Sequence, residues 1–174
     1  ISLGLVGSEM CIRDRLKREP TVEMIIAEFE KYDLTAFKEV VFCGFGEPLT
    51  RHDDLMKVAK YIKEKRSDLS IRINTNGLSS ITLGRDIAPD FKGVIDTVSI
   101  SLNAPTKEEY YELTRACYGV DSFNYMLQFT KACKKYVPSV VLTVVDIIGV
   151  EKIKLCQKIA DGLGVELRVR PFEE

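Results

Sequence analysis

Hydrophobic and polar positions along the chain predict a regular alternation of helices and strands. Some segments carry apolar residues at helical spacing, and between them lie short runs that are continuously apolar or that alternate apolar with polar residues. This order is typical of repeated βα units. Strands are predicted at 40–43, 69–76, 97–104, 140–146 and 165–172, and helices at 21–32, 50–65, 86–91, 106–115, 122–136 and 150–163.

Three of the predicted helices begin with residues that can cap an N-terminus. Thr21 stands alone, whereas Thr50 with Asp53 and Thr106 with Glu109 have the spacing of a capping box. In such a box the hydroxyl accepts a hydrogen bond from a backbone N–H that has no partner within the helix. We therefore expect helices to begin at all three places.

Three predicted strands have one polar face, which is unusual because a parallel sheet covered by helices is normally apolar on both faces. Burying these polar groups without partners would cost about 1–3 kcal/mol each. We therefore expect a concave interior that holds water or a polar ligand; the alternative is an open sheet with one solvated face. The residues are Arg72, Asn74, Asn76, Ser99, Ser101, Asn103, Arg168 and Arg170.

The segment EVVFCGFGEPLT, residues 39–50, combines a buried strand with a shaped loop. Gly44 and Gly46 permit backbone angles that are closed to other residues and let a ligand approach the main chain. Pro48 favours an extended conformation at Glu47, so the polar backbone groups of this loop are not used in a helical turn. The pattern predicts that a small ligand binds here.

Composition limits the function further. The chain has 174 residues, is 45% hydrophobic and has a formal net charge of -1, which suits one globular domain although it is short for a complete (β/α)8 barrel. With a pI of about 6.0 it has no basic surface typical of nucleic-acid or membrane binding. A cytoplasmic protein is the expectation.

No metal-binding motif is evident within the sequence. The five cysteines have no CxxC or similar spacing, and most are expected to be small buried hydrophobic residues. The only histidine, His52, is expected to be exposed at the start of a helix and not catalytic. Asp53 and Asp54 most simply stabilise the N-terminus of that helix.

The first fifteen residues, ISLGLVGSEMCIRDR, resemble a translated sequencing adaptor, so we expect residues 1–15 to be non-native or disordered. The apolar part is too short to span a bilayer. The functional domain is accordingly predicted to comprise residues 16–174.

Several short motifs taken together resemble the radical S-adenosylmethionine (radical SAM) superfamily. GFGEP at 44–48 is followed by NTNG at 74–77 and SISLNAP at 99–105. With LTVVD at 142–146 and LRVRPF at 167–172, the chain more closely resembles small radical SAM proteins described as linked to TatD-type nucleases. The resemblance covers residues 17–174.

This resemblance implies an α/β fold, a partial (β/α)6 barrel that binds S-adenosylmethionine at the carboxyl ends of its strands beside a [4Fe-4S] cluster held by three cysteines. An electron donor reduces the cluster, and the cofactor is cleaved to methionine and a 5'-deoxyadenosyl radical. By position, the methionine ammonium would be held by Gly44, Gly46, Glu47 and Pro48, the ribose or carboxylate would be contacted by Asn74, Asn76, Ser101 and Asn103, and Arg115 would pair with the carboxylate.

One part of the family pattern is absent. The family's CxxxCxxC loop follows a first strand that would precede Leu16, and the 174 residues contain neither; Cys11 stands alone. Since three thiolates are needed, the chain as given is predicted to bind no cluster and to be inactive, in contrast to an intact parent enzyme.

Two other functions agree with the sequence. The chain could be a cluster-free binding module, or a partner of a nuclease, that keeps the pocket for a nucleotide-like ligand. It could also be a conventional barrel enzyme that uses Arg168 and Arg170 to bind an anionic substrate.

Overall fold

In the part of the chain that the structure describes, five parallel strands form a single sheet in which the spatial order follows the order along the chain. The computed structural model describes residues 19–44 and 46–172. Within these residues the predicted α/β class and partial (β/α) barrel are confirmed. The strands are β1 (Glu39–Phe42), β2 (Ser70–Thr75), β3 (Thr97–Ser101), β4 (Ser139–Val145) and β5 (Glu166–Arg170).

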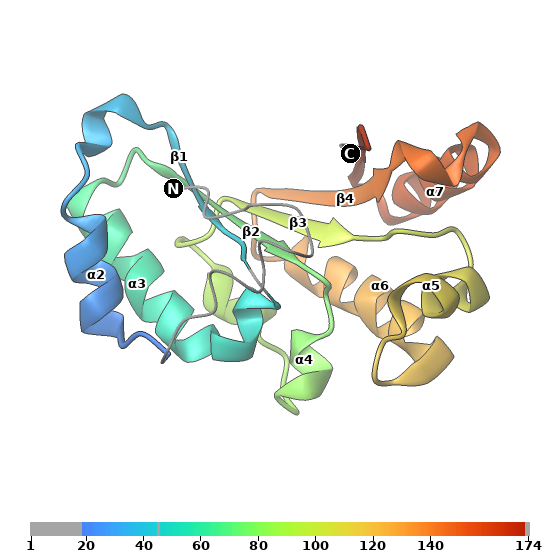
Figure 1. Cartoon of the computed structure of the whole chain (residues 1–174), viewed down its shortest axis with the longest axis horizontal. Helices are drawn as coiled ribbons and strands as arrows, with labels where there is room; N and C mark the ends of the chain where they lie inside the picture. The colour runs from blue at the N-terminus through green and yellow to red at the C-terminus, as the bar shows by residue number, and fades with distance from the viewer. Residues whose placement is uncertain (1–18, 45, 173–174) are drawn as a thin grey trace.

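Helices connect the strands and are arranged around one side of the sheet, from α2 and α3 beside β1 to α7 beside β5 (Figure 1). The α-helices are α2 (Val22–Phe29), α3 (His52–Lys65), α4 (Ser79–Thr82), α5 (Lys107–Thr114), α6 (Ser122–Cys133) and α7 (Val150–Leu163). Short 3-10 helices are η1 (Leu34–Ala36), η2 (Pro48–Arg51), η3 (Ala88–Phe91), η4 (Gly119–Asp121) and η5 (Asp146–Ile148). The predictions for residues 1–15, including Cys11, lie outside the described residues.

The face of the sheet that meets the helices is apolar. Alternate residues of the central strands, such as Ile73, Ile100 and Leu142, are completely buried. They pack in one core with helical residues that include Ile62 and Phe129. Burying each such side chain contributes roughly 1.5–3 kcal/mol, so this face supplies most of the driving force for folding.

The opposite face carries the polar residues, as predicted from their alternation. The register places Asn74 beside Ser99, and Ser101 beside Thr143, which in turn neighbours Arg168. Residues paired in register on parallel strands point to the same face. Val141 shares this face and is buried, yet it does not belong to the hydrophobic core. The two faces of the sheet are therefore chemically distinct.

Two of the predicted helix starts are confirmed, and one is wrong. Thr21 and Thr106 each accept a hydrogen bond from a backbone N–H three residues later. The box at Thr50 does not form: the Thr50 hydroxyl donates to the Glu47 carbonyl oxygen, and Arg51 precedes α3 without a side-chain cap. Pro48 begins a 3-10 turn in this place, so α3 starts only at His52.

Several element boundaries also differ from the predictions. β2 ends at Thr75 and β3 at Ser101, so Asn76 and Asn103 lie just beyond the strands that were expected to contain them. The helix predicted at 21–32 ends at Phe29, and α4 was not predicted. Gly164 adopts the left-handed conformation that ends α7, as expected from its position.

Across the described ranges, none of the helices combines the length and the apolar character that crossing a membrane would require.

Candidate functional site

The Glu47 carboxylate connects the loop after β1 to the end of β2. Its Oε1 accepts hydrogen bonds from the Leu49 backbone N–H at 3.1 Å and from the Thr75 hydroxyl at 2.7 Å. Its Oε2 accepts from the Asn76 backbone N–H at 2.8 Å. Glu47 is extended, as its position before Pro48 predicted. The two loops that the sequence singled out are thus joined through one acidic side chain.

These bonds leave Glu47 with capacity for one more donor. An ionised carboxylate offers about four acceptor positions, two on each oxygen. The described residues fill both positions on Oε1 and one on Oε2. The remaining position on Oε2 can accept a hydrogen bond from a ligand N–H.

Thr75 is a site residue that the sequence reasoning missed. Its side chain belongs to the apolar face of β2 and is only 4% exposed. Its hydroxyl donates to Glu47 and accepts from the Gly77 N–H at 3.1 Å. No local pattern could reveal this, because Glu47 lies 28 residues earlier in the chain.

The loop glycines are open to the outside. Gly44 and Gly46 are exposed, and a Cβ added at either residue would have no atom within 4 Å. Gly46 has a φ of +95°, which side-chain-bearing residues rarely adopt. The backbone here can therefore be approached closely by a small molecule.

The turn after β2 is held by local bonds. The Asn76 side-chain oxygen accepts from the Leu78 N–H at 2.9 Å, so it is already used within its own turn. Gly77 has a φ of +77°, and an added Cβ would come within 3.0 Å of both Ile100 and Met126. This turn is packed against the core, and any ligand contact by Asn76 stays a prediction.

Asn74 lies on the polar face, and one of its buried atoms has no partner among the described residues. Its Oδ1 makes no hydrogen bond to the described residues. Ser99, next to it in register, is also buried. Leaving an acceptor buried and unsatisfied is unfavourable by about 1–3 kcal/mol, so Asn74 is suited to a ligand that donates a hydrogen bond.

The end of β3 borders a pocket of about 370 Å3. Ser101 is half-buried at the last position of the strand, and Asn103 has a φ of +61° with its N–H donating to the Thr143 carbonyl oxygen at 3.3 Å. Lys152 pairs with Glu109 at 3.0 Å in this pocket. The lining residues are Asn103, Ala104, Pro105, Glu109, Glu112, Leu113, Ile147, Ile148 and Lys152.

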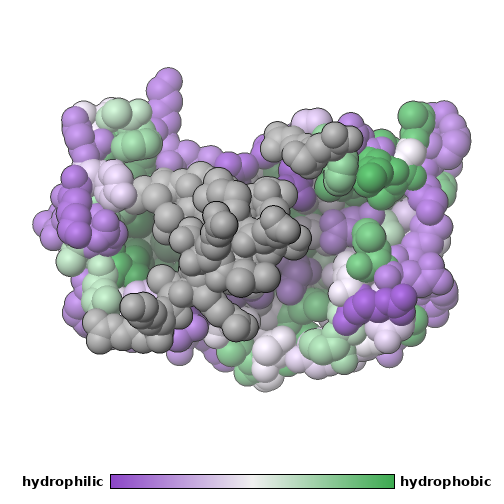
Figure 2. All heavy atoms as spheres, in the orientation of Figure 1, coloured by the Kyte–Doolittle hydropathy of each residue, from purple (hydrophilic) through white to green (hydrophobic). Residues whose placement is uncertain are grey.

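The outer rim of this pocket is apolar. Figure 2 shows hydrophobic residues gathered where β4 leads into α7. Ile147 is 65% exposed and Val150 is 68% exposed, on either side of Gly149. Leu113 of α5 is also exposed and lines the pocket. The site is therefore polar on the sheet and apolar at this edge.

Three arginines predicted to bind ligands occupy different positions. Arg115 ends α5 in the left-handed conformation, exposed, with its guanidinium over the Tyr111 ring. Arg168 and Arg170 are exposed on β5 and share the polar face of the sheet. The structure therefore groups Arg168 with Ser101 and Thr143, whereas no described interaction joins Arg115 to the strands.

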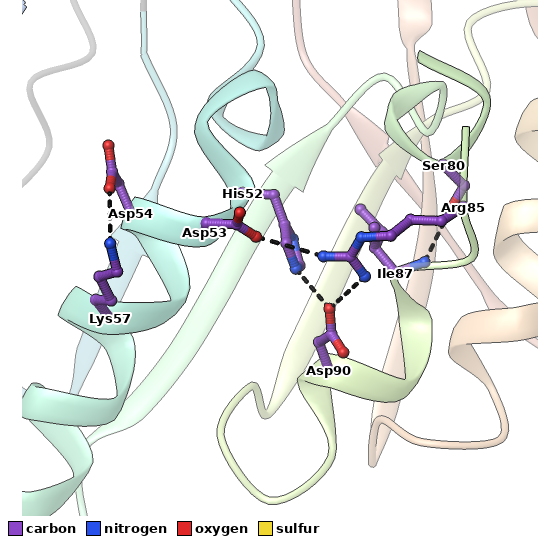
Figure 3. Close-up of polar contacts among 8 residues, drawn as sticks. All are labelled: His52, Asp53, Asp54, Lys57, Ser80, Arg85, Ile87 and Asp90. Atoms are coloured by element: carbon purple, nitrogen blue, oxygen red, sulfur yellow. Dashed lines mark hydrogen bonds and ion pairs between the residues drawn. The ribbon is translucent and has the colours of Figure 1, made fainter. Parts of the chain in front are cut away.

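His52 is buried, contrary to the expectation that it is exposed. Its side chain is 3% exposed, and its Nε2 lies 2.8 Å from the Asp90 carboxylate (Figure 3). Arg85 contacts Asp90 at 2.7 Å and Asp53 at 3.3 Å, and the hydrogen bond from Arg85 lowers the pKa of Asp90. This cluster ties the start of α3 to η3, which the sequence could not indicate because His52 and Asp90 are 38 residues apart.

Comparison with known protein families identifies the family of this chain. Residues 8–156 match the Radical SAM superfamily. The chain belongs to the radical SAM superfamily. One solved structure that it resembles is a radical SAM methyltransferase from Sphaerobacter thermophilus, with 16% sequence identity and a TM-score of 0.42. The match covers 91% of this chain but only 60% of the methyltransferase chain. The search of curated proteins returned no match.

Membership of the radical SAM superfamily implies chemistry that depends on S-adenosylmethionine, and the described residues fit that cofactor. Glu47 has one acceptor position that the described residues leave open and that suits an ammonium group, and the buried Oδ1 of Asn74 has no partner among them. Both lie at or near the carboxyl ends of parallel strands, where ligands of α/β proteins bind.

The described residues do not fit an iron–sulfur cluster. Cys133 and Cys156 are buried as predicted, and burial raises the pKa of both thiols, that of Cys156 to about 11. Cys117 is exposed and Cys43 half-buried, so two of the four described cysteines are buried, whereas most of the five were expected to be. Within residues 19–44 and 46–172, no three His, Cys, Asp or Glu side chains are grouped to hold a metal ion. No step of the chemistry can be assigned to a cluster on these residues.

Proposed function

We propose that this chain is the S-adenosylmethionine-binding part of a radical SAM enzyme. The loop after β1 and the end of β2 bind the methionine end of the cofactor, and the polar face of β2 and β3 binds the ribose. The residues proposed for this site are Gly44, Gly46, Glu47, Pro48, Asn74, Asn76, Ser101, Asn103 and Arg115, with Thr75 as a residue that positions Glu47.

The acceptor geometry of Glu47 carries this proposal. Three protein donors fix the carboxylate and leave one acceptor position on Oε2, beside an open glycine loop. An ammonium group offers N–H donors and a positive charge, and a charged hydrogen bond is roughly twice as strong as a neutral one. The methionine ammonium therefore matches both the charge and the free position of Glu47.

The proposal is tested by titrating the purified chain separately with S-adenosylmethionine, methionine and adenosine. NMR spectroscopy monitors the binding of each ligand. Glu47→Gln removes the charge, and we expect the affinity for S-adenosylmethionine and methionine to fall by about tenfold or more, with adenosine binding unchanged. Asn124→Ala, an exposed substitution on α6, is the control. Undetectable binding of S-adenosylmethionine, or equal affinity in Glu47→Gln, would contradict the proposal.

We propose further that the 174-residue chain assembles no [4Fe-4S] cluster and is inactive alone. Its sequence has no CxxxCxxC motif, and its buried cysteines favour the neutral thiol. Anaerobic reconstitution with iron and sulfide should therefore give no cluster absorbance. An absorbance band that survives desalting would overturn this statement. We also predict that an intact parent enzyme uses an electron donor and is functionally linked to a TatD-type nuclease.

A further inference from the structure

The arginines of the described residues fall into two groups. Four of the seven form ion pairs: Arg51 with Glu19 and Asp54, Arg66 with Asp68, Arg72 with Glu39, and Arg85 with Asp53 and Asp90. Arg115, Arg168 and Arg170 have no ion pair with a described residue, although acidic residues are abundant in this chain. Two of these three lie on one strand.

Arg168 and Arg170 point to the same face because they are two residues apart on β5. The rise of a strand places their Cα atoms roughly 6.6 Å apart, close enough for both guanidinium groups to reach one ligand. Glu166 shares this face on the same strand but forms no ion pair with either arginine. Asp146 follows β4, and its carboxylate accepts from the Phe172 N–H. Among the described residues, therefore, no acidic side chain pairs with these two positive charges, which are available to a ligand.

The polar face continues from this pair toward the proposed cofactor site. Arg168 is in register with Thr143, and Thr143 with Ser101. Ser101 belongs to the site proposed for S-adenosylmethionine, two strands away. Neighbouring strands are about 4.8 Å apart, so the β3 and β5 backbones are separated by about 10 Å. A molecule held by the arginines can reach over β4 to that site.

We propose that Arg168 and Arg170 form the anion-binding part of the substrate site. The ligand is an organic anion with a carboxylate or phosphate group, because the planar guanidinium pairs with both groups through two hydrogen bonds. Its reacting carbon lies several bonds from the anionic group, over β3 and β4. This inference rests on the proposed function for the direction in which the substrate extends. The anion site itself rests on two neighbouring arginines that form no ion pair with a described residue.

Binding of two simple anions to the full chain tests this site. Citrate and inorganic pyrophosphate are titrated separately and followed by isothermal titration calorimetry, with trehalose as an uncharged solute. We expect at least one anion to bind and its affinity to fall about tenfold or more in the double variant Arg168→Gln/Arg170→Gln. A preference for citrate identifies a carboxylate ligand, and a preference for pyrophosphate a phosphate ligand. Both arginines are exposed, so the substitutions leave the core intact.

Lys158→Gln, which removes an exposed positive charge from α7, is the matched control and should leave anion binding unchanged. The inference is overturned if neither anion binds the unsubstituted chain, or if the double variant binds as tightly as Lys158→Gln. S-adenosylmethionine is titrated into the same samples. Its binding without anion binding refutes only the arginine site, and anion binding without it refutes the proposed function.

Discussion

The two faces of the sheet have the same strands and the same register, but they differ in how their side chains are satisfied. On the helical face, residues such as Ile73 and Ile100 are 0% exposed and belong to the hydrophobic core. On the opposite face, the described residues provide neither a partner for the buried acceptor of Asn74 nor an ion pair for Arg168. The first face stabilises the fold, and the second has binding capacity that the described residues do not use.

In this sheet, a polar residue at every second position of a parallel strand indicates a binding surface more than it indicates exposure to solvent. Ser99 and Thr143 lie on the polar face and are nevertheless buried. Polar groups kept in such positions cost free energy unless something bonds to them. If stability and binding are separated in this way, substitutions on the two faces will have different effects.

The largest effect is expected from adjacent residues on opposite faces of β3. Ile100→Ala leaves a cavity in the core and should lower the free energy of unfolding by about 2–5 kcal/mol. Ser101→Ala should change it by less than about 0.5 kcal/mol, because this hydroxyl donates no described hydrogen bond. Urea denaturation monitored by circular dichroism measures both. Equal destabilisation by the two substitutions would show that the faces are not distinct.

A smaller effect is expected where the β2 turn meets the core. Gly77→Ala combines a positive φ with a Cβ placed 3.0 Å from Ile100 and Met126, and should cost about 2–4 kcal/mol. Gly84→Ala is the matched control, since its φ is +66° and its Cβ would meet no atom within 4 Å. Gly84→Ala should lower the free energy of unfolding by about 1 kcal/mol, because only the backbone conformation is unfavourable for alanine. Thermal and urea denaturation measure the loss of stability in both variants. A loss in Gly77→Ala no larger than that in Gly84→Ala would contradict the prediction.

The third effect depends on pH and concerns Tyr110 of α5, which packs against Phe123 at a ring distance of 5.7 Å. Burial, followed by the negative charge of Glu47, raises the pKa of Tyr110 to about 12 from 10.0. At a pH between these two pKa values, the tyrosine loses its proton in the unfolded chain but keeps it in the folded chain. The free energy of unfolding therefore falls as the pH rises. A shift of this size corresponds to roughly 2–3 kcal/mol.

Tyr110→Phe should therefore make the fall in melting temperature between pH 10 and pH 12 less steep. Cys133 and Cys156 also have raised pKa values and will destabilise the fold at alkaline pH in both proteins. Tyr32→Phe, at a residue that is 43% exposed, is the control. An unchanged slope in Tyr110→Phe would show that Tyr110 is not buried with the apolar face.

Local chemistry made much of the fold predictable. The alternation in β2 and β3 identified their polar and apolar faces, because side chains on a strand point alternately to opposite sides. Thr21 and Thr106 were recognised as caps since a cap involves residues only three positions apart. Thr50 was misread because Pro48 favours a different turn over the same residues.

The candidate site was predictable only in part. The residues of the glycine loop were identified from the conformations that Gly46 and Pro48 favour. The role of Thr75 was missed, because a threonine on the apolar face of a strand looks like any other β-branched residue until its partner is known.

By itself, the sequence determined the βα order, the polar face and the family resemblance, since each depends on neighbouring residues or short motifs. The folded chain was needed to show that Glu47 is held by Thr75 and that His52 is buried against Asp90. It was also needed to show that Arg72 forms an ion pair, whereas Arg168 and Arg170 form none with a described residue. These contacts join residues far apart in the chain, and their geometry exists only once the sheet has formed.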